Sequence, residues 1–235
     1  MDYTLSIINE LKAKASPEKA KVMSAFFKTG EGEYAAGDIF WGMTAKEQRD
    51  IVKKYYSLIS LKEISDLLGS PVHEQRFVGL QCLVSKYNKA DKAGQNEIIE
   101  FYLENAAAVN NWDLVDTTAP HLLGAWSYAE NTTDKIWELA RSQQLWMERT
   151  AIVATLYWIR KGNDKPAIDL AEFFLTHKHD LIHKAAGWML REVGKRREKA
   201  LTDFLDKYAK KMPRTMLRYA IERLTTAQRR LYMMK

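Results

Sequence analysis

The feature that most constrains the fold is a short pattern that recurs at nearly constant spacing. In four segments one basic residue precedes a tightly packed apolar helical run, and these basic residues are Arg76, Arg149, Lys184 and Arg214. A fifth segment carries Trp112 where the basic residue is expected, so the five positions follow one another at intervals of 36, 37, 35 and 30 residues. Spacing of this size is typical of stacked helical-pair repeats. The sequence therefore predicts a repeat array in which the Trp112 segment is the exception.

Apolar residues recur at helical spacing along almost the whole chain, and no segment alternates as a strand would. Turn-forming residues separate these runs, at positions 69–71, 89–91, 130–133, 162–164 and 212–213. We predict an all-α chain of about a dozen helices joined in pairs by short turns. Such pairs would form HEAT-like repeats that wind into a curved α-solenoid, as a single domain over residues 1–235.

One long irregular segment is expected at residues 29–44, which contain Gly30, Gly32, Gly37 and Gly42. It resembles a phosphate-binding loop only superficially, because it follows a helical pattern and no Lys-Ser/Thr pair closes it. We interpret it as a loop that joins the first helices to the array. An irregular loop of this length in a compact domain is often functional.

Positive charge is concentrated at the C-terminal end. The chain has a net charge of +6, but residues 195–235 hold 13 Lys/Arg and 4 Asp/Glu, a local net charge of +9 that leaves −3 for the first 194 residues. A local excess of one sign favours a polyanionic partner. The alternative is a solvated, charged final helical pair.

Residues at equivalent repeat positions line up along the concave surface of a solenoid. Arg76, Arg149, Lys184 and Arg214 would then form a ladder of cations suited to following a phosphate backbone. The alternative is that these first-turn cations pair with nearby acids such as Glu74 and Glu148.

Cysteine content and hydropathy indicate the compartment. Cys82 is the only cysteine and lies in an apolar run, so we expect a small core residue in a reducing compartment and no internal disulfide. Residues 1–4 lack the basic start of a signal peptide, and the longest uncharged apolar stretch, residues 150–159, is too short to span a bilayer. We expect a cytoplasmic, nucleoid-associated protein.

The candidate site is the segment from Trp112 to Asp116. A spacing of four puts both side chains on one helical face, one turn apart. Pro120 has no N–H to give to the carbonyl of Asp116, so the helix should bend or end there. A carboxylate that faces a phosphate-binding surface weakens affinity, which indicates a chemical role.

The chemistry that fits is cleavage of a sugar–base bond. A fixed carboxylate stabilises the oxocarbenium-like sugar and can orient the attacking water. Purines alkylated at N3 or N7 are already cationic and leave without a general acid, so one carboxylate suffices. Trp112 and Trp188 could pack against sugar or base faces and sense positive charge through their rings.

Three motifs resemble one known family. They are Trp112-Asp113-x-Val115-Asp116, Trp146-Met147-x-Arg149-x-Ala151-Ile152, and Lys184-Ala185-x-Gly187-Trp188-x-Leu190-Arg191-Glu192. In this order they look like the AlkD-like DNA alkylation repair family, whose members are HEAT-like repeat DNA glycosylases. The resemblance implies that Asp116 is the catalytic carboxylate, that Trp112 and Trp188 are aromatic walls beside the lesion, and that Arg149 is a backbone clamp. Further DNA or lesion contacts are expected at Phe26, Lys184, Arg191 and Arg76.

The implied substrate class is cationic N3- and N7-alkylpurines in duplex DNA, engaged through the backbone without a base pocket, which departs from the usual flipping rule. The chain departs from the family pattern in two places. Phe26 stands where the family often has a tyrosine, and Lys46 stands at the proline position of a loop motif otherwise matched by Phe40, Gly42 and Arg49.

The other conspicuous side chains are assigned to structure. Trp126, Trp137 and Trp158 lie in apolar stripes and are expected to pack in the core. His177, His179 and His183 lack a metal-binding pattern, and we interpret them as surface residues at a helix start. No metal or cofactor is expected.

Two functions agree with these observations. The first is a monofunctional glycosylase, a monomer whose partner is double-stranded DNA containing alkylated bases, with no membrane association and no strand incision. The second is a non-catalytic HEAT-like scaffold that binds nucleic acid or protein.

Overall fold

The computed structural model describes residues 2–234, and helices make up most of them. The predicted all-α fold is confirmed, because the β contacts of the described residues amount to one isolated bridge between Ile39 and Val72. The chain divides into two compact units, Met1–Thr118 and Ala119–Lys235. The predicted single domain and the predicted curvature of the array stay predictions. None of the described helices is long and apolar enough to span a bilayer.

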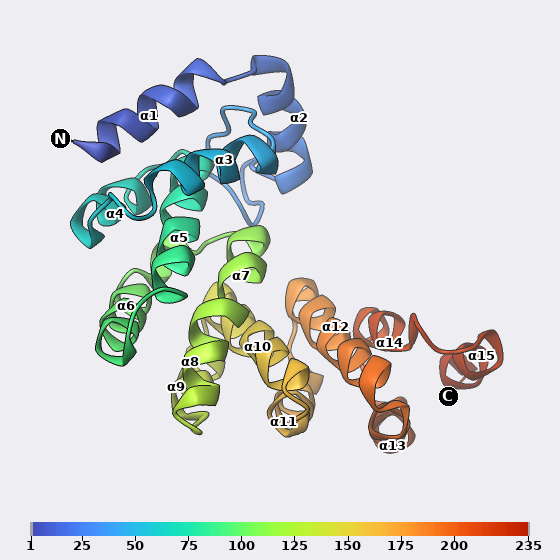
Figure 1. The fold of residues 1–235 in the computed structure, drawn as a ribbon. Coiled ribbons are helices and arrows are strands. Elements are labelled where there is room, and N and C mark those ends of the chain that lie inside the picture. The colour runs from blue at the N-terminus through green and yellow to red at the C-terminus, as the bar shows by residue number, and fades with distance from the viewer. Residues whose placement is uncertain (1, 235) are drawn as a thin grey trace. The chain divides into compact units, whose positions relative to one another are not determined.

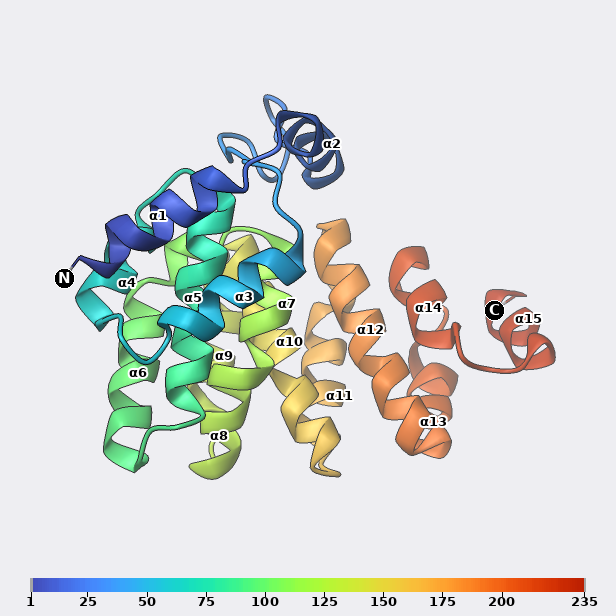
Figure 2. The ribbon, with the colours of Figure 1, turned by 45° about the horizontal axis from the view of Figure 1, so that its top comes forward.

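The first unit is organised around α5, which α1, α3, α4, α6 and α7 all contact. Figure 2 shows α1 lying across α4 and α5. The elements of this unit are α1 (Tyr3–Ala13), α2 (Pro17–Phe27), α3 (Ala45–Tyr55), α4 (Leu61–Leu68), α5 (His73–Tyr87), α6 (Lys92–Glu104), the 3-10 turn η1 (Ala106–Ala108) and α7 (Trp112–Thr118).

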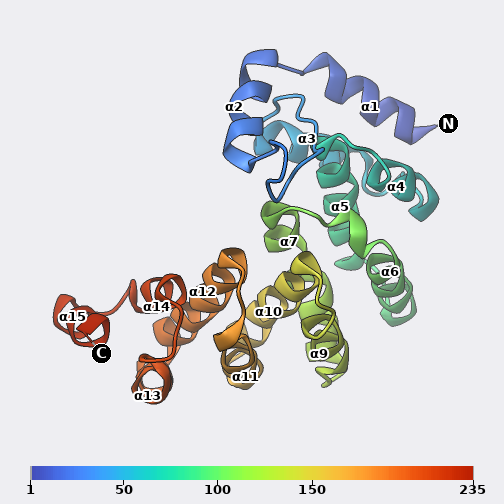
Figure 3. The ribbon, with the colours of Figure 1, turned by 180° about the vertical axis from the view of Figure 1, so that it is seen from behind.

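The second unit has two layers of helices. Figures 1 and 3 show α10, α12 and α14 side by side, with α11 and α13 on one side of them. This arrangement agrees with the predicted helical pairs. The elements are the π-helical turn η2 (Pro120–Gly124), α8 (Ala125–Ala129), α9 (Asp134–Ala140), α10 (Leu145–Arg160), α11 (Lys165–Phe173), the 3-10 turn η3 (Phe174–Thr176), α12 (Asp180–Arg196), α13 (Glu198–Tyr208), α14 (Arg214–Ile221) and α15 (Thr226–Met234).

Local sequence explains where two helices begin. Thr44 with Glu47 and Ser60 with Glu63 form capping boxes that satisfy free N–H groups at the starts of α3 and α4. The first of these boxes also ends the long loop after α2, so the irregular segment predicted at residues 29–44 is confirmed.

The predicted core residues have mixed outcomes. Cys82 is fully buried, and burial raises the pKa of its thiol to about 12, which makes it inert. Trp158 is also buried, and its indole Nε1–H donates to the Ser127 hydroxyl at 2.9 Å. Trp126 and Trp137 are only half-buried.

The close packing of α12 on α14 depends on a residue without a side chain. A Cβ placed on Gly187 would lie 2.4 Å from the carbonyl oxygen of Met216 and 2.6 Å from the Cβ of Tyr219. Because backbone cannot yield as a flexible side chain can, only glycine allows this approach.

We expect Gly187→Ala to lower the free energy of unfolding by about 1–3 kcal/mol, although alanine is the better helix former. Gly69→Ala is the control, since the nearest atom to a Cβ there lies at 3.7 Å. Urea unfolding of both variants checks this. A Gly187→Ala protein as stable as the Gly69→Ala protein would contradict the close approach.

Candidate active site

The candidate site of the first unit is built on α7, a helix of seven residues. Trp112 is its first residue and Asp116 follows one turn later, and both are half-buried. The helix ends at Thr118 and a π-helical turn begins at Pro120, so the interruption predicted from this proline is confirmed. Asp116 therefore belongs neither to the apolar core nor to the fully exposed surface.

The Trp112 ring is held by two aromatic side chains from the end of α2. It stacks on Phe27, with ring centroids 5.2 Å apart and planes inclined by 20°, and it meets the edge of Phe26 at 5.9 Å. Phe27 is buried, whereas Phe26 is 64% exposed. Two of the predicted lesion contacts, Phe26 and Trp112, thus lie side by side.

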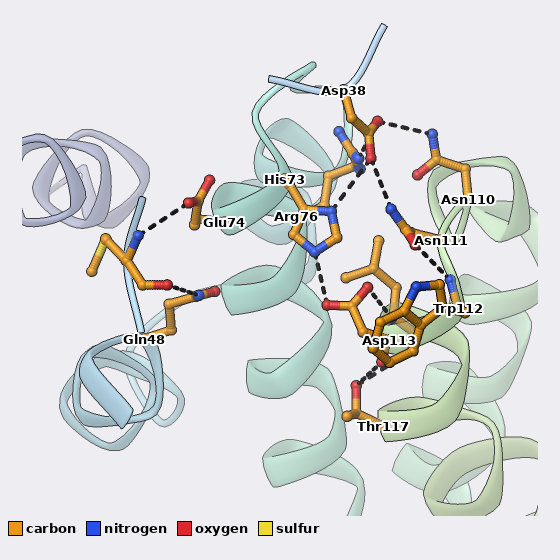
Figure 4. Close-up of polar contacts among 12 residues, drawn as sticks. Asp38, Gln48, His73, Glu74, Arg76, Asn110, Asn111, Trp112, Asp113 and Thr117 are labelled. Carbon is orange, nitrogen blue, oxygen red and sulfur yellow. Dashed lines mark hydrogen bonds and ion pairs between the residues drawn. The ribbon is translucent and has the colours of Figure 1, made fainter. Parts of the chain in front are cut away.

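A buried set of charged side chains lies beside this aromatic group (Figure 4). Asp38, in the loop after α2, accepts from the Arg76 guanidinium at 2.7 Å and pairs with His73 Nδ1 at 3.4 Å. The other ring nitrogen of His73 bonds Asp113, the second residue of α7, at 2.9 Å. The second guanidinium nitrogen of Arg76 donates to the Ser70 carbonyl at 2.8 Å.

Two asparagines connect the same carboxylate to the start of α7. The Asn110 and Asn111 side-chain amides both donate to Asp38, each at 3.4 Å. The Asn111 side-chain oxygen in turn accepts from the Trp112 backbone N–H at 2.8 Å. The first turn of α7 is therefore tied to the loop by side chains rather than by packing alone.

These contacts fix the charge state of His73. Burial alone would lower its pKa, but the hydrogen bonds to Asp113 and Asp38 outweigh burial and raise the pKa from 6.5 to about 9. For Asp38 the effects have the opposite sign. Burial alone would raise the pKa of its carboxyl, but the hydrogen bond from His73 and the positive charge of Arg76 hold this pKa below its usual value. At neutral pH the set holds two cations and two carboxylates.

A second acid anchors the loop to α5. Glu74 is fully buried, and its carboxylate accepts the backbone N–H groups of Trp41, Gly42 and Met43 at 2.8–3.3 Å. Gly42 has a φ of +85°, and a Cβ there would lie 2.2 Å from the carbonyl oxygen of Ser16. The loop therefore passes the start of α2 closely, and Phe40 beside it stacks on His73 at 4.5 Å.

In the second unit, Trp188 and Arg191 lie on α12 and share the acid Glu192. The Trp188 indole Nε1–H donates to Glu192 at 3.2 Å, and Arg191 lies 3.7 Å from the same carboxylate. Arg191 also pairs with Glu222, the residue that follows α14. Trp188 is half-buried, so its ring retains an accessible part.

Comparison with known proteins decides the family. The model of the family described as DNA alkylation repair enzyme matches residues 7–224. The chain belongs to the DNA alkylation repair enzyme family. A solved structure of a predicted DNA alkylation repair enzyme from Enterococcus faecalis has the same fold, with a TM-score of 0.71 and 18% identity, over 91% of this chain and 98% of that one. No curated protein sequence matches.

The predicted ladder of exposed cations is not found in the structure, because two of its four members are buried. Arg76 is only 3% exposed and pairs with the buried Asp38, so it is not an exposed member of a ladder, and its predicted DNA contact stays a prediction. Arg149 is 5% exposed and donates to the Leu181 carbonyl at 2.7 Å, so it is not an exposed member of a ladder either. Its role beside a lesion stays a prediction.

The remaining predicted cations differ from these two. Lys184 is half-buried and pairs with Asp180 at 2.8 Å, whereas Arg214 is exposed and donates to the Met233 carbonyl. The alternative, that these cations pair with acids, agrees with the pairs Arg76–Asp38 and Lys184–Asp180. Of the two acids named for it, Glu74 accepts backbone N–H groups and Glu148 pairs with His177 at 3.0 Å.

The three histidines lie at the start of α12, as expected, but they are half-buried rather than surface residues. His179 accepts the Leu181 N–H as the N-cap, and His183 bonds the His177 carbonyl. The described residues contain no group of three or more side chains placed to hold a metal ion.

Sequence reasoning missed the charged set, above all Asp38, His73 and Asp113. A usable signal was present in α5, where His73, Glu74 and Arg76 begin a helix that is otherwise largely apolar. Charged residues in an apolar helix need partners, because an isolated buried charge is strongly unfavourable.

The charge on His73 predicts a pH-dependent stability. The pKa of His73 in the folded state, about 9, exceeds the ordinary value of 6.5. The contribution of His73 to the free energy of unfolding is therefore complete below pH 6.5 and is lost as the pH rises through 9. The full contribution is on the order of 3 kcal/mol.

Urea unfolding of the wild type and of His73→Gln between pH 6 and pH 10 measures this contribution. We expect the difference between the two proteins to shrink as the pH rises. A difference that stays constant over this range would show that His73 is not the titrating group.

Proposed function

We propose that this member of the alkylation repair family is a monofunctional DNA glycosylase that excises cationic N3- and N7-alkylated purines from duplex DNA. The observation that carries the proposal is the pair Trp112 and Asp116, one turn apart on α7 and both partly accessible. The family supports a role in alkylation repair.

The reaction requires little from the protein. The bond between C1′ of the sugar and N9 of the alkylated purine breaks, and its electron pair moves to the cationic base, which becomes neutral. The sugar passes through an oxocarbenium-like cation, water adds at C1′, and a proton is released. One carboxylate stabilises this cation and orients the water, and we assign that role to Asp116.

Substrate choice follows from the charge of the leaving group. A cationic alkylpurine departs without a general acid, whereas a neutral purine must be protonated as it leaves. An aromatic face beside the lesion favours positive charge through its ring electrons. Trp112 supplies such a face, and its contacts with Phe26 and Phe27 limit its motion.

Side chains of the second unit are proposed as further contacts with the DNA. Trp188 would form a second aromatic wall, and Lys184 and Arg191 would bind the phosphate backbone after exchanging their present acidic partners for phosphate oxygens. Arg149 would act beside the lesion as a clamp once it leaves the Leu181 carbonyl. None of these roles needs a lysine nucleophile, so the strand stays uncut.

We expect Asp116→Asn to retain DNA binding while single-turnover release of 7-methylguanine falls by roughly 10²- to 10³-fold, because the substitution removes the charge that stabilises the sugar cation. Asp50→Asn is the matched control, an acid on the exposed surface of the same unit that pairs with Lys53. Chromatography of the released base gives the rate. Equal release by wild type and Asp116→Asn would remove the role assigned to Asp116.

We also expect the wild type to discriminate by leaving-group charge. Oligonucleotides of one sequence that carry 7-methylguanine or neutral hypoxanthine at the same position separate this effect from sequence. Release of the cationic base should exceed that of the neutral base by at least about 10²-fold, since the proposed reaction uses one carboxylate and no general acid. Comparable rates for the two lesions would indicate a different mechanism.

A further inference from the structure

His73 occupies an unusual position for a histidine, because both of its ring nitrogens bond carboxylates that come from different segments. Nδ1 lies 3.4 Å from Asp38 of the loop between α2 and α3, and Nε2 lies 2.9 Å from Asp113 of α7. The residue itself is 1% exposed. His73 therefore connects this loop to the helix that carries Trp112 and Asp116 (Figure 4).

The same imidazole belongs to the aromatic group around Trp112. Its ring stacks on Phe40 at 4.5 Å with planes inclined by 24°, and it lies 5.2 Å from Phe27. Phe27 in turn stacks on Trp112. Trp112 is thus connected to His73 by two routes, through Phe27 and through the neighbouring residue Asp113.

Only a protonated imidazole can make both polar contacts as a donor, because a neutral ring has a single N–H. The pKa of about 9 means that this form prevails at neutral pH. With Arg76, the protonated His73 balances the charges of Asp38 and Asp113. Loss of the imidazolium would leave one excess negative charge beside the first turn of α7.

The helix that depends on this connection is short. α7 has seven residues and continues through Ala119, which is in the α conformation, into the π-helical turn η2, so its last turn is held by the chain and its first turn by tertiary contacts. Asp113 lies in its first turn and is held by His73 on the side chain and by Thr117, whose hydroxyl donates to the Asp113 carbonyl at 2.7 Å.

We propose that His73 is a positioning residue of this site: by bonding Asp38 and Asp113 at once, it fixes the first turn of α7 and with it the orientation of Trp112 and Asp116. His73 touches no reacting atom. Its importance for base release rests on the proposed glycosylase function, whereas its effect on the orientation of Trp112 does not.

The test compares His73→Gln with the double variant His73→Gln/Asp113→Asn. Glutamine removes the positive charge, and the second substitution removes one carboxylate, so that Arg76 and Asp38 again balance. We expect His73→Gln to lower the single-turnover rate of 7-methylguanine release by roughly 10- to 100-fold, through displacement of α7, with DNA affinity changed by less than about 3-fold. The double variant should release base faster than His73→Gln. We expect it to recover at least about one third of the decrease in the logarithm of the release rate that His73→Gln causes.

A control and a reserve variant accompany the test. His177→Gln removes another histidine–carboxylate pair, in the second unit, and should leave the rate unchanged. Asp113→Asn alone removes the negative charge from the contact between His73 and α7 and so weakens it, while Asp38 stays paired with Arg76. The Asp113 side chain is 18% exposed, so this variant stays testable if His73→Gln does not fold.

The indole N–H resonance of Trp112, assigned by its loss in Trp112→Phe, gives a readout that does not depend on activity. We expect this resonance to shift in His73→Gln and in Asp113→Asn, and the Trp188 resonance to stay in place. An unshifted Trp112 resonance, or a His73→Gln protein that releases base at the wild-type rate, overturns the positioning role. A wild type that releases no alkylated base overturns the proposed function instead, and the resonance still decides the role of His73.

Discussion

The structure around α7 depends on a buried set of charges that is balanced only as a whole. Each member alone would be costly in the interior, because an ion loses its hydration when it is buried. This cost is offset by the pairing of two cations, Arg76 and His73, with two carboxylates, Asp38 and Asp113. The four residues come from three segments that are far apart in the sequence. The set therefore stabilises one arrangement of the loop, α5 and α7, and disfavours others.

This arrangement suits the chemistry that we propose. An aromatic wall can favour a cation only if its face stays in place, and a carboxylate stabilises a developing charge best when it is fixed in advance. Trp112 receives that restraint from Phe27 on its face and from the Asn111 side chain at its backbone. Asp116 receives it indirectly, because it shares a short helix with Trp112 and Asp113. On this proposal the buried set of charges serves the site as well as the stability of the fold.

The sequence predicted those features that depend on neighbouring residues. Helical periodicity, the long loop before Thr44 and the interruption of the helix at Pro120 are all local, and the structure contains each of them. The family followed from spaced motifs, which are also a property of the sequence alone. The assignment of Asp116 rests on the same resemblance and stays a proposal.

Pairings between segments could not be predicted in the same way. Equivalent repeat positions suggested that Arg76 and Arg149 would share an exposed surface, but one neutralises Asp38 and the other bonds the Leu181 carbonyl. A repeat pattern predicts the position of a residue on its helix. It does not predict which residue the side chain will contact, because that partner depends on the packing of segments far away in the chain. The buried partner of Arg76 lies 38 residues earlier, in a loop that has no periodic pattern.

The most direct measurement uses the wild-type protein, in excess over a duplex oligonucleotide with a single 7-methylguanine. Mass spectrometry identifies the free base, and a denaturing gel shows whether the strand is cut. The account predicts free 7-methylguanine well above spontaneous depurination, together with an intact strand that carries an abasic site. Release no faster than in the absence of protein would contradict it.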